Sequence, residues 1–252
     1  MVQISAVIIT FNEEKNIARC LQALTGIAEE IIVLDSFSSD QTQNICASHG
    51  VRFYQHAFTG YVEQKNKALE YAQYPYILSL DADEVITPEL KASILQVKEN
   101  WDADGYYFSR LTNYCGTWIK HSNWYPDRKL RLWNRNKGKW SGVLVHEMVK
   151  LQPNSKVKVL QGDLQHYSYD SEKQFIDRTI KYAQFSAKGL SMEGKKSSYL
   201  KIIFSPTWRF IKNYLLDRGF LDGRPGFVIS YYMAFGVYLK YKELLKLNKK
   251  LN

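Results

Sequence analysis

Residues 76–83 of this 252-residue chain read Tyr-Ile-Leu-Ser-Leu-Asp-Ala-Asp, a mostly apolar run that ends in two carboxylates. A short run of this kind is typical of a strand that is covered on both faces of a sheet. Asp81 and Asp83 fall at the carboxyl end of the predicted strand. Because two carboxylates around one small residue can converge on one hard cation, the stretch predicts a metal site at the strand end.

Similar strands precede this one, and helical patterns separate them. The predicted strands are residues 4–10, 30–34, 51–54 and 76–80, and the predicted helices are residues 13–24, 42–49 and 61–72. This alternation predicts a mostly parallel sheet in an α/β fold. Ligands of such sheets bind beyond the carboxyl ends of the strands, where Thr10, Asp35 and Asp81 fall.

The pattern changes after residue 88. Short strands are expected at residues 105–108, 129–133 and 157–160, and helices at residues 172–189, 199–217 and 227–247. The sequence therefore predicts a sheet-forming part followed by a helical extension.

The net charge of +9 lies entirely in that extension. From residue 188 onward there are 13 Lys and Arg against 4 Asp and Glu, whereas the preceding residues balance at 21 against 21. Such a segment favours an anionic partner, either a membrane or a nucleic acid, and the alternative is a solvated basic face. The longest apolar run, residues 227–239, is shorter than the roughly 20 residues that a spanning helix needs. It predicts a helix in the membrane interface or a helical hairpin that packs on the core.

Three isolated cysteines suit a reducing compartment, and the chain start lacks the pattern of a signal peptide. We therefore expect a cytoplasmic protein.

Three segments resemble the family 2 glycosyltransferases of GT-A fold. They are residues 7–14 (VIITFNEE), residues 31–36 (IIVLDS) with Ser39-Asp40-Gln41-Thr42, and residues 78–84 (LSLDADE). Within that family the chain is similar to the lipopolysaccharide core glucosyltransferase-like branch, through Val145-His146-Glu147 and the Gly-Phe-Leu-Asp-Gly stretch at residues 219–223. The resemblance extends over nearly the whole chain. It implies a Rossmann-like GT-A sheet that is flanked by helices, with a C-terminal helical extension.

The resemblance also implies which parts of the chain form which domains and what each domain does. Residues 1–170 would form the catalytic domain, with a nucleotide-sugar half at 1–87 and an acceptor half at 88–170. Residues 171–252 would form a helical, membrane-associating region. The implied reaction is an inverting transfer of a sugar from a nucleotide-diphosphate sugar, most simply a UDP-sugar, to a cell-envelope glycan or lipid-linked acceptor. The enzyme would lie peripherally on the inner face of the cytoplasmic membrane, with an anionic membrane surface as a partner.

Individual residues take roles from the same resemblance. The implied donor-binding residues are Thr10, Asn12, Glu13, Asp35, Lys65, Asn66 and Asp81. Asp83 would be the principal ligand of a divalent Mg or Mn ion, and Asp81 is a further candidate ligand. His166 could complete the metal site or contact the diphosphate, and the alternative for this single histidine is a structural role. Without the resemblance, Lys65 on its predicted helix would be interpreted as a solvated charge.

An inverting transfer needs a base that takes the proton of the acceptor hydroxyl. Glu147 is the first candidate because aromatic residues that could stack on a sugar lie near it in sequence. Many relatives carry an Asp-rich pair at this point, whereas this chain has His146-Glu147, so either residue could be the base. Asp127 is a further candidate.

Basic and aromatic residues lie between the predicted centres. Lys129, Arg131 and Trp140 are candidate acceptor-binding residues, and the alternative for the two charges is a surface ladder.

Two other functions agree less well with the sequence. A sugar nucleotidyltransferase usually carries a Gly-rich, basic phosphate loop after its first strand, where this chain has the acidic stretch Thr-Phe-Asn-Glu-Glu at residues 10–14. A nucleic-acid-binding protein would carry basic and aromatic residues across the sheet, whereas the charge here lies in helical segments. We therefore expect no nucleic-acid partner.

Overall fold

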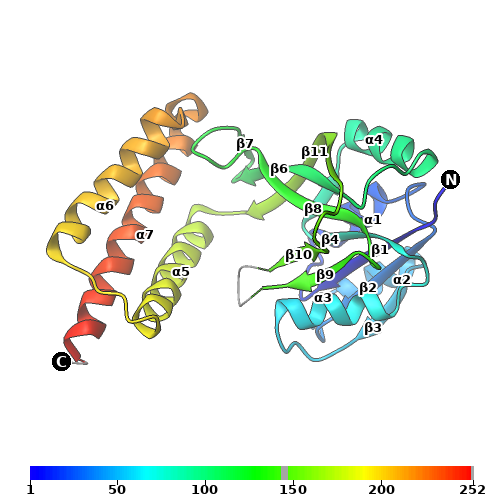
Figure 1. Ribbon diagram of the computed structural model, residues 1–252, viewed down its shortest axis with the longest axis horizontal. Coiled ribbons are helices and arrows are strands. Elements are labelled where there is room, and N and C mark those ends of the chain that lie inside the picture. Colours follow the sequence, from blue (N-terminus) through cyan, green and yellow to red (C-terminus); the bar gives the residue numbers. More distant parts are fainter. Residues whose placement is uncertain (143–146, 251–252) are drawn as a thin grey trace. The chain divides into compact units, whose positions relative to one another are not determined.

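The computed structural model describes residues 1–142 and 147–250 (Figure 1). The chain divides into two compact units. The first contains Met1–Arg110 and Asp127–Tyr167, and the second contains Leu111–Pro126 and Ser168–Asn252.

The first unit alternates strands and helices as the sequence predicts. Its elements are β1 (Ile4–Thr10), α1 (Ile17–Ala23), β2 (Glu30–Asp35), α2 (Thr42–Ser48), β3 (Arg52–Gln55), α3 (Tyr61–Glu70), β4 (Tyr76–Asp81), β5 (Glu84–Ile86), α4 (Pro88–Glu99), β6 (Gly105–Tyr114), β8 (Asp127–Asn134), β9 (Gly138–Ser141), β10 (Met148–Leu151) and β11 (Val157–Tyr169). The last residues of β6 and β11 belong to the second unit.

Helix α4 was not predicted from the sequence patterns, although residues that favour the start of a helix are present. Thr87 caps the helix by accepting a hydrogen bond from the backbone N–H of Leu90 at 3.3 Å, and Pro88 occupies the first turn. Both are favoured at a helix start, because a cap satisfies a free N–H and proline has none to satisfy.

The main sheet has the strand order β3-β2-β1-β4-β8-β6-β11-β5. Strands β1 to β4 pair in parallel, whereas the pairs β4–β8, β6–β8 and β5–β11 are antiparallel. The predicted α/β class, with a parallel sheet flanked by helices, is confirmed. The antiparallel strands extend this sheet beyond β4.

Both faces of β1, β2 and β4 are buried along most of each strand, as continuous apolar runs require. Ile4, Ala6 and Ile8 of β1 pack with α1, α2 and α4 on one face. Val7, between them in sequence, packs with Ala68 and other residues of α3 on the opposite face. Because side chains alternate along a strand, one apolar run supplies residues to the cores on both faces of the sheet. The polar residues lie at the strand ends.

The second unit contains β7 (Thr117–Ile119) and the helices α5 (Glu172–Met192), α6 (Tyr199–Ile211) and α7 (Gly223–Lys250). A π-helical turn at Lys212–Leu216 and a 3-10 turn at Gly219–Asp222 connect α6 to α7. Helix α7 lies between α5 and α6 and packs on both (Figure 1). The predicted C-terminal helical extension is confirmed.

None of the helices in the described residues is both long enough and apolar enough to cross a membrane.

The Gly-Phe-Leu-Asp-Gly stretch holds the second unit together. A Cβ on Gly226 would lie 1.8 Å from the carbonyl oxygen of Gly219, so a side chain cannot fit where the two backbones meet. Asp222 accepts hydrogen bonds from the backbone N–H and from Nδ1 of His121, at 2.9 and 2.8 Å. These contacts give the stretch a structural role in tying the start of α7 to the segment after β7.

Candidate active site

Thr10 and Asp35 lie at the carboxyl ends of β1 and β2 and are paired in register. The Thr10 hydroxyl donates to Oδ1 of Asp35 at 2.9 Å, and the backbone N–H of Ser38 donates to Oδ2 at 2.8 Å. Asp35 is fully buried among these donors. The structure thus brings two of the predicted donor-binding residues together and fixes the orientation of the carboxylate.

The loop after β1 is tied to the loop after β2. Asn12 adopts a left-handed backbone conformation with φ of 54°, and its Oδ1 accepts from the backbone N–H of Ser39 at 2.8 Å. The backbone N–H of Glu13 donates to Oγ1 of Thr42 at 2.8 Å. Asparagine tolerates this conformation better than most residues, which suits it to a tight loop at the strand end.

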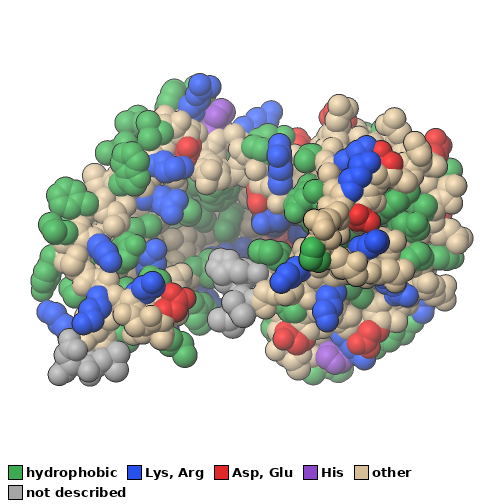
Figure 2. Space-filling view, viewed as in Figure 1, with side chains coloured by type: hydrophobic (Ala, Val, Ile, Leu, Met, Phe, Trp, Pro, Cys, Tyr) green, Lys and Arg blue, Asp and Glu red, His purple; other side chains and the backbone are tan. Residues whose placement is uncertain are grey.

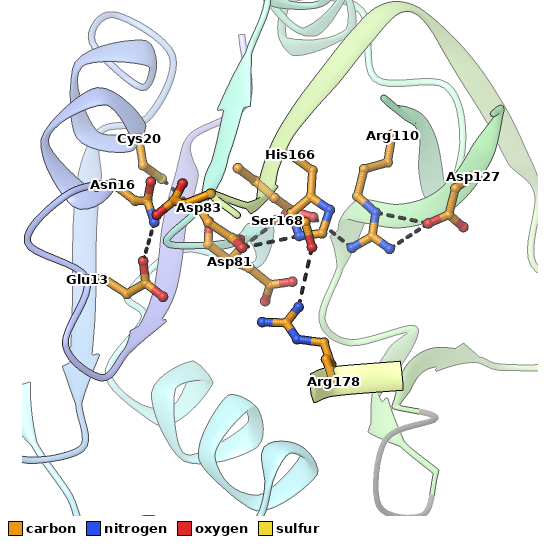
Figure 3. Close-up of polar contacts among 12 residues, drawn as sticks. Glu13, Asn16, Cys20, Asp81, Asp83, Arg110, Asp127, His166, Ser168 and Arg178 are labelled. Atoms are coloured by element: carbon orange, nitrogen blue, oxygen red, sulfur yellow. Dashed lines mark hydrogen bonds and ion pairs between the residues drawn. The ribbon is translucent and has the colours of Figure 1, made fainter. Parts of the chain in front are cut away.

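Glu13 lies near the carboxylates that follow β4 (Figure 3). Burial raises the pKa of its carboxyl group above the usual value, and the charges of Asp83, Asp40 and Asp81 raise it further. Glu13 therefore lies where neighbouring negative charges make its own ionisation less favourable, a place where a cation would be stabilised.

Asp81 is held by two buried cations. Lys65 Nζ lies 2.7 Å from Oδ1 of Asp81, and Nη2 of Arg131 lies 2.6 Å from Oδ2. The same Nη2 is 2.6 Å from Oε1 of Glu84, which is fully buried. Burial would raise the pKa of Asp81, but the charges of Arg131 and Lys65 outweigh it and hold this pKa well below its usual value. Asp81 is therefore ionised, with both oxygens engaged by cations of the protein.

Asp83 instead pairs with His166. Oδ2 of Asp83 lies 3.2 Å from Nε2 of His166, and both side chains are partly exposed (Figure 3). Strand β11 brings them together because its antiparallel register with β5 sets His166 opposite Glu84, next to Asp83 in sequence. The sequence singled out both residues, and the long strand β11 explains why they meet.

Asp83 and His166 are two candidate ligands of a divalent cation. One carboxylate oxygen and one imidazole nitrogen lie within reach of a single ion, and Glu13 adds negative charge nearby. Among residues 1–142 and 147–250 there is no group of three His, Cys, Asp or Glu side chains that could hold a metal. Mg²⁺ in nucleotide sites is usually held by one or two carboxylates, with phosphate oxygens and water completing its shell.

Glu147 lies beside this region. Its Oε1 is 3.7 Å from Nζ of Lys65, the cation that also binds Asp81, and its side chain is 21% exposed. The ammonium group of Lys65 lies over the ring of Trp140, 4.3 Å from the centroid. Lys65 is thus buried between two candidate functional carboxylates and is not a solvated helix charge. His146, the other candidate base, lies outside the described residues.

Asp127 is engaged by two cations. Nη2 of Arg110 lies 2.6 Å from Oδ2 of Asp127, and Nζ of Lys129 lies 3.1 Å from Oδ1. Burial raises the pKa of Asp127, but the charges of Arg110 and Lys129 exceed this effect and lower the pKa overall. A lowered pKa makes a carboxylate a weaker base. Arg110 was not predicted as a site residue, although a single basic residue within the aromatic strand β6 could have indicated it.

Replacing Asp127 by Asn should lower the free energy of unfolding by about 1–2 kcal/mol at pH 7, in line with hydrogen bonds to charged groups. A carboxyl group whose pKa is lowered by folding stabilises the native state above its unfolded pKa of about 3.9. This contribution is lost as the pH falls through the folded pKa. Urea unfolding of both proteins between pH 7 and pH 2 should show the difference begin to shrink near pH 4 and decrease further as the pH falls. A difference that persists at pH 2 would contradict an electrostatic origin.

The structure buries two of the predicted acceptor-binding residues. Arg131 and Trp140 are each 3% exposed, with Arg131 bound to Asp81 and Glu84 and Trp140 packed on Trp133. Lys129 remains partly exposed beside Asp127. Arg131 binds Asp81 and Glu84, and Trp140 lies under the ammonium group of Lys65, so both support these residues, and their acceptor-binding role stays a prediction.

Asn66 likewise has a supporting position. Its Nδ2 donates to the carbonyl oxygen of Trp140 at 2.9 Å, and its Oδ1 accepts from the backbone N–H of the same residue at 3.1 Å. This pair of bonds joins α3 to β9. It keeps Trp140 under the ammonium group of Lys65.

Comparisons with known proteins show the family of the chain. The sequence model of the family described as Glycosyl transferase family 2 matches residues 5–150. An uncharacterized glycosyltransferase of Rickettsia typhi is 31% identical over 99% of this chain and 89% of its own length. The lipopolysaccharide core biosynthesis glycosyltransferase LpsC of Rhizobium meliloti is 28% identical over 94% of this chain and 93% of its own length.

Among solved structures, S. aureus TarS 1–349 matches with a TM-score of 0.48 and 16% identity, over 96% of this chain and 91% of that chain.

The family match covers more than half of the chain, including the strand ends described above, and similarity to glycosyltransferases extends over nearly all of it. The chain belongs to glycosyltransferase family 2.

Proposed function

We propose that this glycosyltransferase transfers a sugar, with inversion, from a UDP-sugar to a lipid-linked or cell-envelope saccharide of the lipopolysaccharide core type. The observation that carries the proposal is the position of Lys65, which contacts both Asp81 at the end of β4 and Glu147. One buried cation thereby joins the donor side of the site to the candidate base. The relative LpsC, a lipopolysaccharide core glycosyltransferase, supports the acceptor class.

Thr10, Asn12, Glu13 and Asp35 form the nucleotide end of the site in this proposal. Asp35 is a buried, fixed acceptor that suits the N–H of a base or a ribose hydroxyl. Asp81 faces the ribose from the end of the neighbouring strand, oriented by Lys65 and Arg131.

Asp83 and His166 would hold the divalent cation, as their 3.2 Å separation permits. When bound, an Mg or Mn ion there neutralises the charge that develops on the leaving diphosphate. The ammonium group of Lys65 adds a fixed positive charge on the same side of the sheet.

Glu147 acts as the base. It accepts the proton of the acceptor hydroxyl while the hydroxyl oxygen forms a bond to the anomeric carbon. The bond from that carbon to the diphosphate oxygen breaks, and its electron pair leaves with the UDP. Glu147 suits this task better than Asp127, because Asp127 has a lowered pKa and is already bound by Arg110 and Lys129.

The donor assignment can be tested by thermal unfolding with UDP, GDP, CDP and ADP, each with Mn²⁺ or with EDTA. A ligand at 100 times its Kd stabilises the native state by about 2.7 kcal/mol. For a chain of this size that raises Tm by roughly 5–10 °C. We expect UDP with Mn²⁺ to give the largest shift and EDTA to remove most of it. A larger shift with another nucleotide would reassign the donor, and equal shifts in EDTA would contradict the role of the metal.

A further inference from the structure

Helix α6 has an unusual surface for a soluble helix. None of its 13 residues is fully buried, although the helix packs on α7. Leu200, Ile203, Phe204 and Trp208 are 58–67% exposed, and their positions i, i+3, i+4 and i+8 set them on one side of the helix.

The apolar surface continues through the turns after α6. Leu215 and Leu216 in the π-helical turn are exposed, as are Phe220, Leu221 and Phe227 around the start of α7. We call Leu200, Ile203, Phe204, Trp208, Leu215 and Leu216 the α6 face. Contiguous exposed apolar surface of this kind marks an interaction site in a soluble protein.

The segment that carries the α6 face is basic. Residues 195–224 contain seven Lys and Arg and two Asp, a net charge of +5. Asp217 is paired with Lys212 at 2.8 Å, and the Asp222 side chain is 6% exposed and bonded to His121. Both acids are thus engaged, so the exposed charge around the apolar side chains is basic. Figure 2 shows hydrophobic side chains with Lys and Arg among them along the left edge, where α6 lies in Figure 1.

We propose that the α6 face docks on an anionic lipid bilayer, with α6 lying in the headgroup region parallel to the surface. The apolar row, which includes a Trp, matches the acyl boundary of such a bilayer. The basic residues beside it match the anionic headgroups. A second copy of the chain is a poor occupant, because a symmetric contact would bring two surfaces of charge +5 together.

The docking element differs from the one that the sequence suggested. The apolar run at residues 227–239 lies in α7, where Tyr232 and Phe235 are half-buried and Tyr232 contacts Phe175 of α5. That run serves mainly to hold the three helices together. Phe227 and Tyr231 of the run are 47% and 50% exposed, whereas Leu200, Ile203, Phe204 and Trp208 of α6 are 58–67% exposed.

Flotation of the full chain with vesicles tests the proposal without any sugar transfer, so its outcome is independent of the proposed reaction. One vesicle type is phosphatidylcholine alone, and the other contains about one third phosphatidylglycerol. We expect binding to the anionic vesicles that weakens as salt is raised, since charges beyond about 8 Å are screened at physiological ionic strength. An apolar triple variant, Leu200→Gln, Phe204→Gln and Trp208→Gln, should bind at least about tenfold more weakly.

A charge variant separates the electrostatic part. Changing Lys195, Lys196 and Lys201 to Gln should weaken binding at low salt by roughly a hundredfold, since each basic residue near an anionic surface adds about one factor of five. The matched control changes Lys137, Lys139 and Lys150, exposed lysines of the first unit, to Gln with the same loss of net charge. The apolar control changes the exposed Val157 and Val159 to Gln.

Binding that falls equally in the variants and their controls would overturn the proposal, because it would reflect total charge or hydrophobicity. Equal flotation with both vesicle types, or none with either, would also overturn it. Sedimentation velocity without lipid tests the remaining candidate partner, a second copy of the chain. A wild-type dimer that the apolar triple variant converts to a monomer would show that the α6 face binds a second copy.

Discussion

Replacing Asp83 by Ala is expected to lower kcat/KM for sugar transfer by at least about a thousandfold, a loss of roughly 4 kcal/mol of transition-state stabilisation. Asp83 offers the accessible carboxylate at the end of β4, since both oxygens of Asp81 are held by Lys65 and Arg131. Without Asp83 the cation has only His166 among the two proposed protein ligands. Steady-state kinetics over a range of Mn²⁺ concentrations, together with calorimetric titration of UDP, measure both effects.

The chain provides its own matched control for this prediction. Asp102-Ala103-Asp104 repeats the same triplet away from the carboxyl edge of the sheet, and Asp102 is bound by Lys158 and by the hydroxyl of Tyr106. The Asp102→Ala variant should keep nearly full activity and normal dependence on Mn²⁺. Near wild-type transfer in Asp83→Ala, with the fold intact by circular dichroism, would refute the metal-binding role of Asp83. His166→Ala should show a weaker form of the Asp83→Ala defect, because the carboxylate would remain.

Glu147→Gln is expected to lower kcat about a hundredfold or more, as general bases typically contribute 10²–10⁴. Glutamine keeps the size and polarity of the side chain but cannot accept the proton. Binding of UDP should change little, because among the described residues Glu147 approaches the donor residues at Lys65, at a distance of 3.7 Å. Single-turnover rates at saturating donor and acceptor, with UDP titrations alongside, separate chemistry from binding.

Two further variants decide between the candidate bases. Asp127→Asn should retain most of its turnover if Glu147 is the base, whereas a larger loss in Asp127→Asn than in Glu147→Gln would reverse the assignment. His146→Gln tests the remaining candidate in the same assay. A Glu147→Gln enzyme with normal turnover at saturation but weak donor binding would indicate that Glu147 orients Lys65 and takes no proton.

Much of the fold could be predicted from local patterns. Residues 4–10, 30–34 and 76–80 were expected as strands, and β1, β2 and β4 match them to within one residue. Apolar runs are reliable here because both faces of the parallel strands are covered. The antiparallel strands of the sheet were harder to predict. The expected strand at residues 157–160 is the start of β11, whose later residues mix polar and apolar side chains in a partly exposed strand.

The candidate site could likewise be predicted only in part. Thr10, Asp35, Asp81 and Asp83 could be identified because polar residues directly after buried strands must lie at one edge of a parallel sheet. Their individual roles could not be read in this way. Lys65 looked like a solvated helix charge and Arg131 like a surface ligand, yet the structure buries both against Asp81.

The sequence by itself thus determined the α/β class, the strand ends that carry the polar residues, and the family, since each depends on the order of residues along short segments. Only the tertiary structure decided that Asp81 pairs with Lys65 and Arg131, that Asp83 meets His166, and that α6 exposes its apolar row. Arg131 reaches Asp81 across 50 residues of chain because β8 lies antiparallel to β4. A charge buried by folding must find an opposite charge nearby, and which one it finds depends on how distant strands are paired.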